Sequence, residues 1–112
     1  MENCIFCKII KGEIPSTVVY EDDMVFAFND INPIAPVHVL IIPKNHMSSV
    51  MEINLSNENY IAEIHKAANK IAEKLGIAES GFRLITNCGK DAGQTVFHLH
   101  YHLLGGKVLG WG

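Results

Sequence analysis

Five short runs of apolar and β-favouring residues divide this 112-residue chain, at residues 17–21, 24–29, 38–43, 82–87 and 96–104. Val, Ile, Tyr and Phe dominate these runs, and such residues are typical of β-strands. Asp22 and Asp23 separate the first two runs and indicate a tight turn, so we expect an antiparallel hairpin. The segment 29–36, NDINPIAP, contains two prolines and is expected to be an irregular loop that leads to the third run.

The hydrophobic period changes to a helical one between residues 55 and 75. One face of this segment would carry Ile61, Ile64, Ala68, Ile71, Ala72 and Leu75. Asn54 or Ser56 can cap its start and Gly76 follows its end, so we predict one long amphipathic helix that packs on a sheet. Residues 4–11 are predicted to form a short helix that ends at Gly12.

These elements predict an α+β fold, with a five-stranded antiparallel sheet, one long helix and a short N-terminal helix. No repeat, linker or low-complexity tract divides the sequence, so residues 1–112 are interpreted as a single domain. Hydrophobic residues make up 48% and charged residues 19% of the chain, which is typical of globular proteins.

Charge and cysteine content narrow the class of partner. The net charge of −3 gives no diffuse basic surface, so a binder of long nucleic acid is not expected. The N-terminus lacks the pattern of a signal peptide, and the apolar run 39–42 is too short to cross a bilayer, so no membrane association is expected. Three cysteines, two of them in a Cys-x-x-Cys pair, suit a reducing compartment, and we expect a cytoplasmic protein.

The last run contains three histidines in strict alternation, His98, His100 and His102. On a strand this spacing places the three imidazoles on one face and Leu99 and Tyr101 on the other. Lysine, threonine or glutamate would keep an exposed face equally polar, so a surface of histidines without function is a poor explanation. A single metal ion held by all three is also disfavoured, because residues four apart on a strand lie roughly 13 Å from each other.

The three alternating histidines are better explained as an array in which each ring contacts a different part of a bound molecule. A neutral imidazole whose Nδ1–H is held can attack phosphorus or an acyl carbon through Nε2, and His100 has a histidine on each side. The preceding loop, 87–95, contains two glycines that allow close approach to a phosphate, followed by donors at Gln94 and Thr95.

The sequence resembles the histidine-triad superfamily, whose signature of three alternating histidines separated by apolar residues is matched by HLHYHLL at 98–104. The resemblance extends over nearly the whole chain, through CIFCKII, FNDINPIAPVHVLIIPKNH and NCGKDAGQTVFHLHYHLLGG. It is strongest to the branch of histidine-triad nucleotide-binding proteins, which are purine nucleoside phosphoramidate hydrolases. The retained third histidine, His102, favours hydrolysis, because the transferase branch has glutamine there.

The resemblance implies a role for each matching residue. His100 would be the nucleophile that forms a covalent nucleotidyl adduct, His102 would contact the phosphoryl group, and His38 would support the triad. Asp30 would bind the ribose hydroxyls, with Asn87, Gln94 and Thr95 near the phosphate and leaving group. The nucleobase slot would be lined by Phe6, Ile9, Ile14, Phe28 and Ile31. Relatives also imply a homodimer. No catalytic metal is expected, because imidazoles and amides can stabilise the phosphoryl charge and the departing amine.

The Cys4-x-x-Cys7 pair has three explanations: a redox pair, coincidence within an apolar helix, or half of a zinc site. No second such pair is present, so a zinc ion would have to take its other ligands from histidines, and His46 and His98 are the candidates. Some relatives with this pair bind zinc through that set, which favours one structural zinc per chain. Its loss is expected to loosen the N-terminal helix more than it slows the chemistry.

Two rival functions remain open. One is hydrolysis of dinucleoside polyphosphates within the same superfamily, and the other is a nucleotide-binding or scaffold role with vestigial catalysis. His65 and Cys88 are expected to be spectators, and the sequence assigns no role to Lys107 or Trp111 in the tail.

Overall fold

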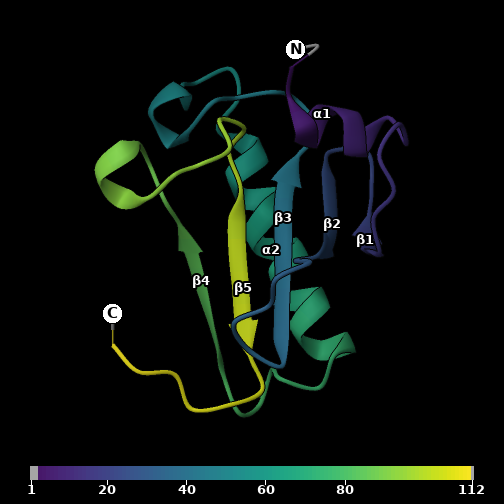
Figure 1. Ribbon diagram of the computed structural model, residues 1–112, viewed down its shortest axis with the longest axis vertical. Coiled ribbons are helices and arrows are strands. Elements are labelled where there is room, and N and C mark those ends of the chain that lie inside the picture. Colours follow the sequence, from purple (N-terminus) through teal and green to yellow (C-terminus); the bar gives the residue numbers. More distant parts are fainter. Residues whose placement is uncertain (1–2, 112) are drawn as a thin grey trace.

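The computed structural model describes residues 3–111, in which five strands and two α-helices follow one another with short connections (Figure 1). None of the helices in this range is long and apolar enough to cross a membrane. In chain order the elements are α1 (Ile5–Ile10), β1 (Val18–Glu21), β2 (Val25–Asn29), β3 (Val37–Pro43), the 3-10 turn η1 (Val50–Glu52), α2 (Asn59–Lys74), β4 (Phe82–Thr86), the 3-10 turn η2 (Lys90–Ala92) and β5 (Tyr101–Gly105).

The strands form one antiparallel sheet in the order β1-β2-β3-β5-β4. The predicted α+β fold with five strands and two helices is therefore confirmed. The predicted hairpin is also present, and its turn is held by Asp22, whose Oδ1 accepts hydrogen bonds from the backbone N–H groups of Met24 and Val25 at 2.8 Å. The hairpin β4–β5 places the histidine segment next to β3, in the middle of the sheet.

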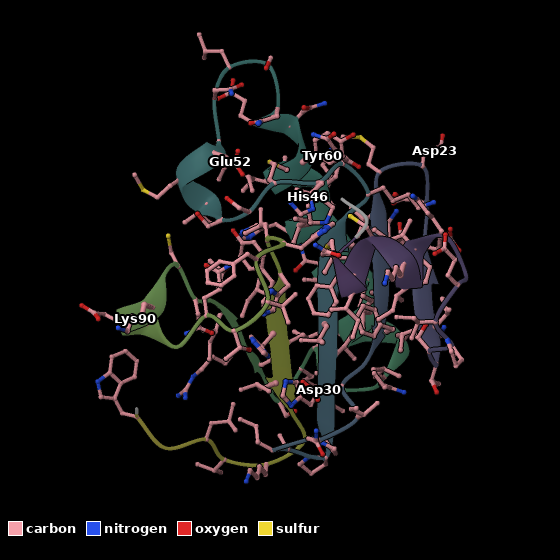
Figure 2. All side chains as sticks on the ribbon, turned by 45° about the horizontal axis from the view of Figure 1, so that its top comes forward. Asp23, Asp30, His46, Glu52, Tyr60 and Lys90 are labelled. Atoms are coloured by element: carbon pink, nitrogen blue, oxygen red, sulfur yellow. The ribbon has the colours of Figure 1, made fainter. Side chains whose placement is uncertain are left out.

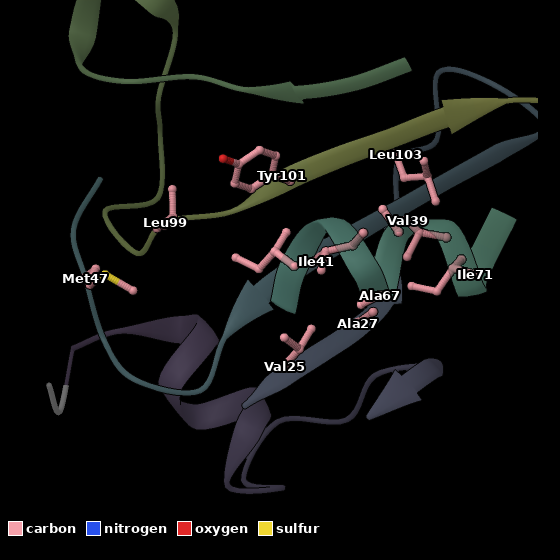
Figure 3. Packing of buried hydrophobic residues seen from close by; sticks show 12 residues of the cluster. Val25, Ala27, Val39, Ile41, Met47, Ala67, Ile71, Leu99, Tyr101 and Leu103 are labelled. Atoms are coloured by element: carbon pink, nitrogen blue, oxygen red, sulfur yellow. The ribbon is translucent and has the colours of Figure 1, made fainter. Parts of the chain in front are cut away.

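The long helix α2 covers one face of the sheet, behind β2, β3 and β5 in Figure 1. The alternate residues of these strands that point to α2 form the main core with Ile64, Ala67, Ala68 and Ile71 of the helix (Figure 3). They include Val25 and Ala27 of β2, Val39 and Ile41 of β3, and Leu99, Tyr101 and Leu103 of the last segment. The predicted apolar face of the histidine segment is thus the face that packs toward α2.

The opposite face of the sheet is only partly covered. Here α1 packs Phe6 and Ile9 against the other set of alternating side chains, which comprises Phe26, Phe28, Leu40 and Ile42. Because α1 is six residues long, it covers one end of this face and leaves the part near β5 open to a cavity. Period-two alternation therefore separates a core face from a binding face.

The prediction that residues 96–104 form one strand is wrong at its start. β5 begins at Tyr101 and ends at Gly105, so His98 and His100 precede the strand and only His102 lies within it. Two causes end the pairing there. β4 stops at Thr86, opposite Tyr101, and the chain before Tyr101 turns away from β3, because the N–H of Leu99 donates to the Met47 carbonyl although β3 continues to Pro43. The alternation of faces nevertheless continues through the unpaired residues, because Leu99 is buried in the core.

The predicted start of the long helix is also wrong. α2 begins at Asn59 after a Glu58 N-cap that makes no side-chain capping bond, so neither Asn54 nor Ser56 caps it. The Asn54 side chain instead accepts a hydrogen bond from the N–H of Ser56 at 2.9 Å, and Asn57 Oδ1 accepts one from the N–H of Asn54. These local bonds compete with helix formation and hold the segment in turns. The helix ends as predicted, before Gly76.

Gly106 should be intolerant of any side chain. Its φ of +88° lies in the left-handed region, and an added Cβ would lie 2.9 Å from the Cβ of Pro36. We expect Gly106→Ala to lower the free energy of unfolding by about 1–3 kcal/mol through backbone strain and overpacking. Urea unfolding followed by circular dichroism measures the change.

The matched control is Gly110→Ala, because an added Cβ at Gly110 meets nothing within 4 Å. Equal stability of the two variants would contradict the predicted strain at Gly106.

Candidate active site

The three alternating histidines enter three different environments. His98 joins Cys4, Cys7 and His46, whereas His102 joins Asp30 and His38, and these are two separate groups of potential metal ligands within residues 3–111. His100 lies between them, with its ring centroid 5.2 Å from that of His102. Figure 2 shows His46 beside α1 and Asp30 toward the opposite end of β3. The expectation that one ion does not bind all three rings agrees with this separation.

His100 is oriented by a main-chain oxygen. Its Nδ1 lies 2.8 Å from the carbonyl oxygen of His98, and because a carbonyl only accepts, Nδ1 carries the proton. In the neutral ring the Nε2 lone pair is then free. The ring is 7% exposed, packs edge-on against Phe6 at 5.1 Å between centroids, and lines the cavity beside α1. The main-chain carbonyl of His100 itself accepts from Thr86 Oγ1 at 2.8 Å.

His38 and His102 form a hydrogen-bonded relay with a defined direction. The backbone N–H of Ile34 donates to His38 Nδ1 at 3.2 Å, so the proton of the neutral His38 ring lies on Nε2. That Nε2 lies 2.9 Å from His102 Nδ1, which therefore accepts. His102 consequently carries its own proton on Nε2, and its ring lines the cavity. The relay presents an N–H donor to whatever binds there.

Burial keeps both rings of the relay neutral. It lowers the pKa of His38, and the nearby Asp30 carboxylate opposes this effect without cancelling it. Burial, and after it the neighbouring His100 and His38, lower the pKa of His102 to about 4. The 3.3 Å contact between His38 Nε2 and Asp30 Oδ2 is therefore a hydrogen-bonding contact of a neutral ring and not an ion pair at pH 7.

The same bonds argue against a metal at Asp30, His38 and His102, although their ligand atoms lie close enough for one. A metal on His38 Nε2 would require the proton on Nδ1, where the Ile34 N–H already donates. The hydrogen on His38 Nδ1 and the amide hydrogen of Ile34 would then point at each other and repel. This group is better suited to hydrogen bonding with a ligand than to metal binding.

A cavity of about 360 Å³ opens between α1, the loop after β2 and the histidine segment. This volume is within the range of small-molecule sites. Its lining includes nine of the residues singled out from the sequence: Phe6, Ile9, Ile14, Phe28, Asp30, Ile31, Thr95, His100 and His102. It is apolar at the α1 end and polar at the histidine end, and no lysine or arginine lines it among the residues that the structure describes.

Four predicted residues do not line the cavity. His38 and His98 instead contact the two histidines that do, His38 through its ring to His102 and His98 through its carbonyl to His100. Gln94 is buried and its amide is fully used by the loop, since Oε1 accepts from the N–H of Gly89 at 2.9 Å and Nε2 donates to Ser48 and Val96 carbonyls. Asn87 directly follows β4 and is also absent from the lining. Gln94 therefore shapes the loop that presents Thr95.

Some lining residues were missed by the sequence reasoning. They are Ile5, Pro15, Ser16, Asn29, Asn32, Leu40 and Val96. Leu40 carries a readable signal, because it is two residues after His38 and therefore shares its face of β3. The polar loop residues Asn29 and Asn32 carry no such signal, since an irregular loop has no period.

The Cys4, Cys7, His46 and His98 cluster has the geometry of a four-ligand metal site. His98 Nδ1 lies 3.3 Å from Cys4 Sγ, 3.5 Å from Cys7 Sγ and 3.1 Å from His46 Nδ1, and all four ligand atoms lie within 4.8 Å of one another. A tetrahedral zinc separates its nitrogen and sulfur ligands by roughly 3.3–3.8 Å. The cluster could therefore hold one metal ion.

Protonation states support this assignment. His98 Nε2 lies 2.9 Å from the carbonyl oxygen of Pro43, so the proton is on Nε2 and the Nδ1 lone pair faces the two sulfurs. This is the arrangement of a metal-binding histidine whose second nitrogen is held by a carbonyl. Burial, and then Cys4, raise the pKa of the Cys7 thiol to about 11, which a bound zinc would reverse by deprotonating it. Cys88 is half-buried and lies outside the cluster.

Acidification should destabilise the protein through His102. Its pKa is about 4 in the folded chain and its ordinary value is about 6.5, so unfolding takes up a proton between these pH values. Stability from this group is complete above about pH 6.5 and is lost as the pH falls toward 4. Between pH 7 and pH 4.5 we expect the wild type to lose about 1–2 kcal/mol more than His102→Asn, after allowance for partial exposure.

Urea unfolding at several pH values, followed by circular dichroism, measures this difference. The variant is the control, because it keeps every other titrating group. Parallel pH profiles of the two proteins would show that His102 has the same pKa in the folded and the unfolded chain, which would contradict the prediction.

Comparisons with known proteins agree over nearly the full length of the chain. The HIT domain family model matches residues 11–109. The chain is 50% identical over 109 residues to the purine nucleoside phosphoramidase of Escherichia coli (strain K12), which covers 97% of this chain and 92% of that protein. The solved HIT family hydrolase from Clostridium thermocellum is 69% identical with a TM-score of 0.97, covering 100% and 97% of the two chains. A histidine triad protein from Clostridium difficile is 54% identical, again with a TM-score of 0.97 over 100% and 97%.

Proposed function

Because this chain belongs to the HIT domain family of hydrolases, we propose that it cleaves purine nucleoside phosphoramidates through a covalent intermediate on His100. One observation carries the proposal: the His100 Nδ1–H is held by a main-chain carbonyl, which leaves Nε2 as an unencumbered nucleophile in the cavity. The relative from Escherichia coli that is named a purine nucleoside phosphoramidase supports the substrate class.

The first half of the reaction transfers the nucleotidyl group to the enzyme. His100 Nε2 attacks phosphorus, the phosphorus–nitrogen bond breaks, and its electron pair leaves on the amine. The amine takes up one proton, which the hydroxyl of Thr95, a residue that lines the cavity, would relay from solvent. The His102 Nε2–H donates to the phosphoryl oxygen, on which negative charge accumulates.

The second half returns the enzyme to its starting state. A water attacks the phosphorus of the adduct, the bond from phosphorus to Nε2 breaks, and the electron pair returns to His100. One proton of the water is released, so the net reaction consumes one water and yields a nucleoside monophosphate and an amine. Neutral donors meet the phosphoryl charge throughout, because no lysine or arginine of the described chain lines the cavity.

The nucleoside would lie across the cavity from apolar to polar. Phe6, Ile9, Ile14, Phe28 and Ile31 supply the apolar slot proposed for the purine. Asp30 has one oxygen, Oδ1, that accepts from the N–H of Asn32 and a second, Oδ2, toward His38, so its remaining lone pairs can accept from ribose hydroxyls. Asn87 and Gln94 would act on the phosphate end by shaping the loop before Thr95.

We propose a structural zinc in the cysteine and histidine cluster, with Cys4, Cys7, His46 and His98 as ligands. The zinc would hold α1 against the histidine segment and contribute no catalytic step.

We also propose that the protein is a homodimer in the cytoplasm. Val108 and Trp111 of the tail are each 98% exposed, and they supply an apolar surface that a second subunit would bury.

A substrate panel tests the proposed function. Adenosine phosphoramidate and guanosine phosphoramidate should be hydrolysed much faster than a diadenosine polyphosphate, with His100→Asn as the blank. Rapid quenching and mass spectrometry should detect a nucleotidyl group on His100. Faster turnover of the polyphosphate would favour the dinucleoside polyphosphate hydrolase, and turnover without an adduct would exclude the covalent route.

A further inference from the structure

His98 belongs to both sites at once. Its ring is fixed at both nitrogens, with Nε2 at 2.9 Å from the Pro43 carbonyl and Nδ1 among the ligand atoms of Cys4, Cys7 and His46. Its main-chain carbonyl, on the same residue, accepts the Nδ1–H of His100 at 2.8 Å. The residue that completes the metal cluster therefore also sets the orientation of the proposed nucleophile.

The sheet does not hold this carbonyl in place, because β5 starts at Tyr101 and His98 lies outside the ladder. The planar peptide unit that carries the carbonyl is held by one backbone bond, from the N–H of Leu99 to the carbonyl of Met47, the residue after His46. The His98 ring, in contrast, is fully buried with no exposed area. The direction of the carbonyl thus depends on the bond to Met47 and on what holds the His98 ring, and both lead to the cluster of Cys4, Cys7, His46 and His98.

A second connection runs through α1. Cys4 is the N-cap of this helix and Cys7 is within it, while Phe6 and Ile9 of the same helix line the cavity. The Phe6 ring packs edge-on against both His98 and His100, at 6.0 and 5.1 Å between centroids. A six-residue helix is too short to be stable alone, so its position depends on its attachments.

We propose that His98 is a positioning residue for the reaction: ligation at the cysteine and histidine cluster fixes its ring, and its carbonyl then holds His100 with the proton on Nδ1 and Nε2 toward phosphorus. The inference rests on the proposed phosphoramidase and on metal binding. It changes the expectation from sequence that metal loss loosens α1 more than it slows the chemistry. Both kcat and the affinity for nucleotide should depend on the metal, although the metal touches no substrate.

The direct test reads the tautomer of His100 and needs no turnover. Protein with ¹⁵N-labelled histidine is stripped of metal and then titrated with zinc, and long-range ¹H–¹⁵N spectra follow the His100 ring. The population with Nδ1–H should rise in proportion to zinc occupancy. In the stripped protein we expect kcat for adenosine phosphoramidate to fall by about 10–100-fold and AMP to bind more weakly, as for other residues that orient a functional group through a second contact.

Two variants separate positioning from general stability. His46→Ala should reproduce the stripped state at saturating zinc, and His46→Cys, which keeps a zinc ligand, should restore both the tautomer and kcat. His65→Ala, on the exposed face of α2, should change neither. Where His46→Ala does not fold, the zinc titration of the wild type alone decides the question.

Retention of the Nδ1–H tautomer and of full kcat in folded, zinc-free protein would overturn the inference. Lack of phosphoramidate turnover by the zinc-loaded wild type would instead overturn the proposed function. The tautomer titration would still report on His98 in that case, so the two failures are distinguishable.

Discussion

The variant His100→Asn is expected to lose phosphoramidase activity by about 10⁴-fold or more, because it removes the attacking nitrogen itself. Binding of AMP should change by no more than about threefold, since the variant keeps Asp30, His102 and the apolar slot. No other side chain can replace the ring. His102 has its Nδ1 occupied by His38 and its proton on Nε2, so it is a donor at the cavity and not a nucleophile.

Steady-state kinetics with adenosine phosphoramidate and calorimetric titration with AMP measure the two effects. His65→Asn makes the same substitution on an exposed histidine of α2 and should retain full activity. If the turnover rate of His100→Asn is within tenfold of that of the wild type, the covalent mechanism is wrong. Unchanged AMP binding together with no loss of phosphoramidase rate would support a nucleotide-binding or scaffold protein whose catalysis is vestigial.

The different roles proposed for the histidines follow from the main-chain groups that contact their rings. A carbonyl beside His98 Nε2 leaves a lone pair for metal, and a carbonyl beside His100 Nδ1 leaves a lone pair for phosphorus. An amide N–H beside His38 reverses the order and makes the relay a donor. In the proposed mechanism one residue type thus supplies a ligand, a nucleophile and a hydrogen-bond donor, according to which main-chain group it contacts.

Local patterns were sufficient to predict most of the fold. The hairpin turn at Asp22 and the amphipathic stripe of α2 are decided by neighbouring residues, and both are present. The stripe was less accurate at its end, because Leu75 is 37% exposed whereas Ala67 is buried. Alanine is small enough to fit on either side of a helix boundary, so a pattern of hydrophobicity places it poorly.

Strand ends could not be predicted in the same way. Alternation persists from Leu99 to Leu103, but pairing at Leu99 would need partners in β3 and β4. Those partners are distant in sequence, so a local pattern of residues does not show where pairing ends. β3 ends at Pro43, whose carbonyl is used by His98 instead of by a ladder. The sequence identified which residues share a face, while the residue that joins the two sites became visible only with the backbone.

Removal of metal should have the largest effect on stability. The four ligand atoms come from α1, the segment after β3 and the segment before β5, so a bound ion ties together three parts of the chain that are distant in sequence. A ligand present at a thousandfold excess over its dissociation constant stabilises the folded state by about 4 kcal/mol. We therefore expect chelation to lower the melting temperature by about 15 °C or more.

Cysteine variants provide the matched comparison. Cys7→Ala removes a ligand from the cluster, whereas Cys88→Ala makes the same change at a half-buried cysteine outside it. Elemental analysis of protein purified without added metal should find about one zinc ion per chain in the wild type and in Cys88→Ala, and almost none in Cys7→Ala. The melting temperature should fall only in Cys7→Ala. If both variants melt alike and none of the proteins carries metal, the cysteine pair has no structural ion, and the packing of Phe6 and Ile9 alone must hold α1 on the sheet.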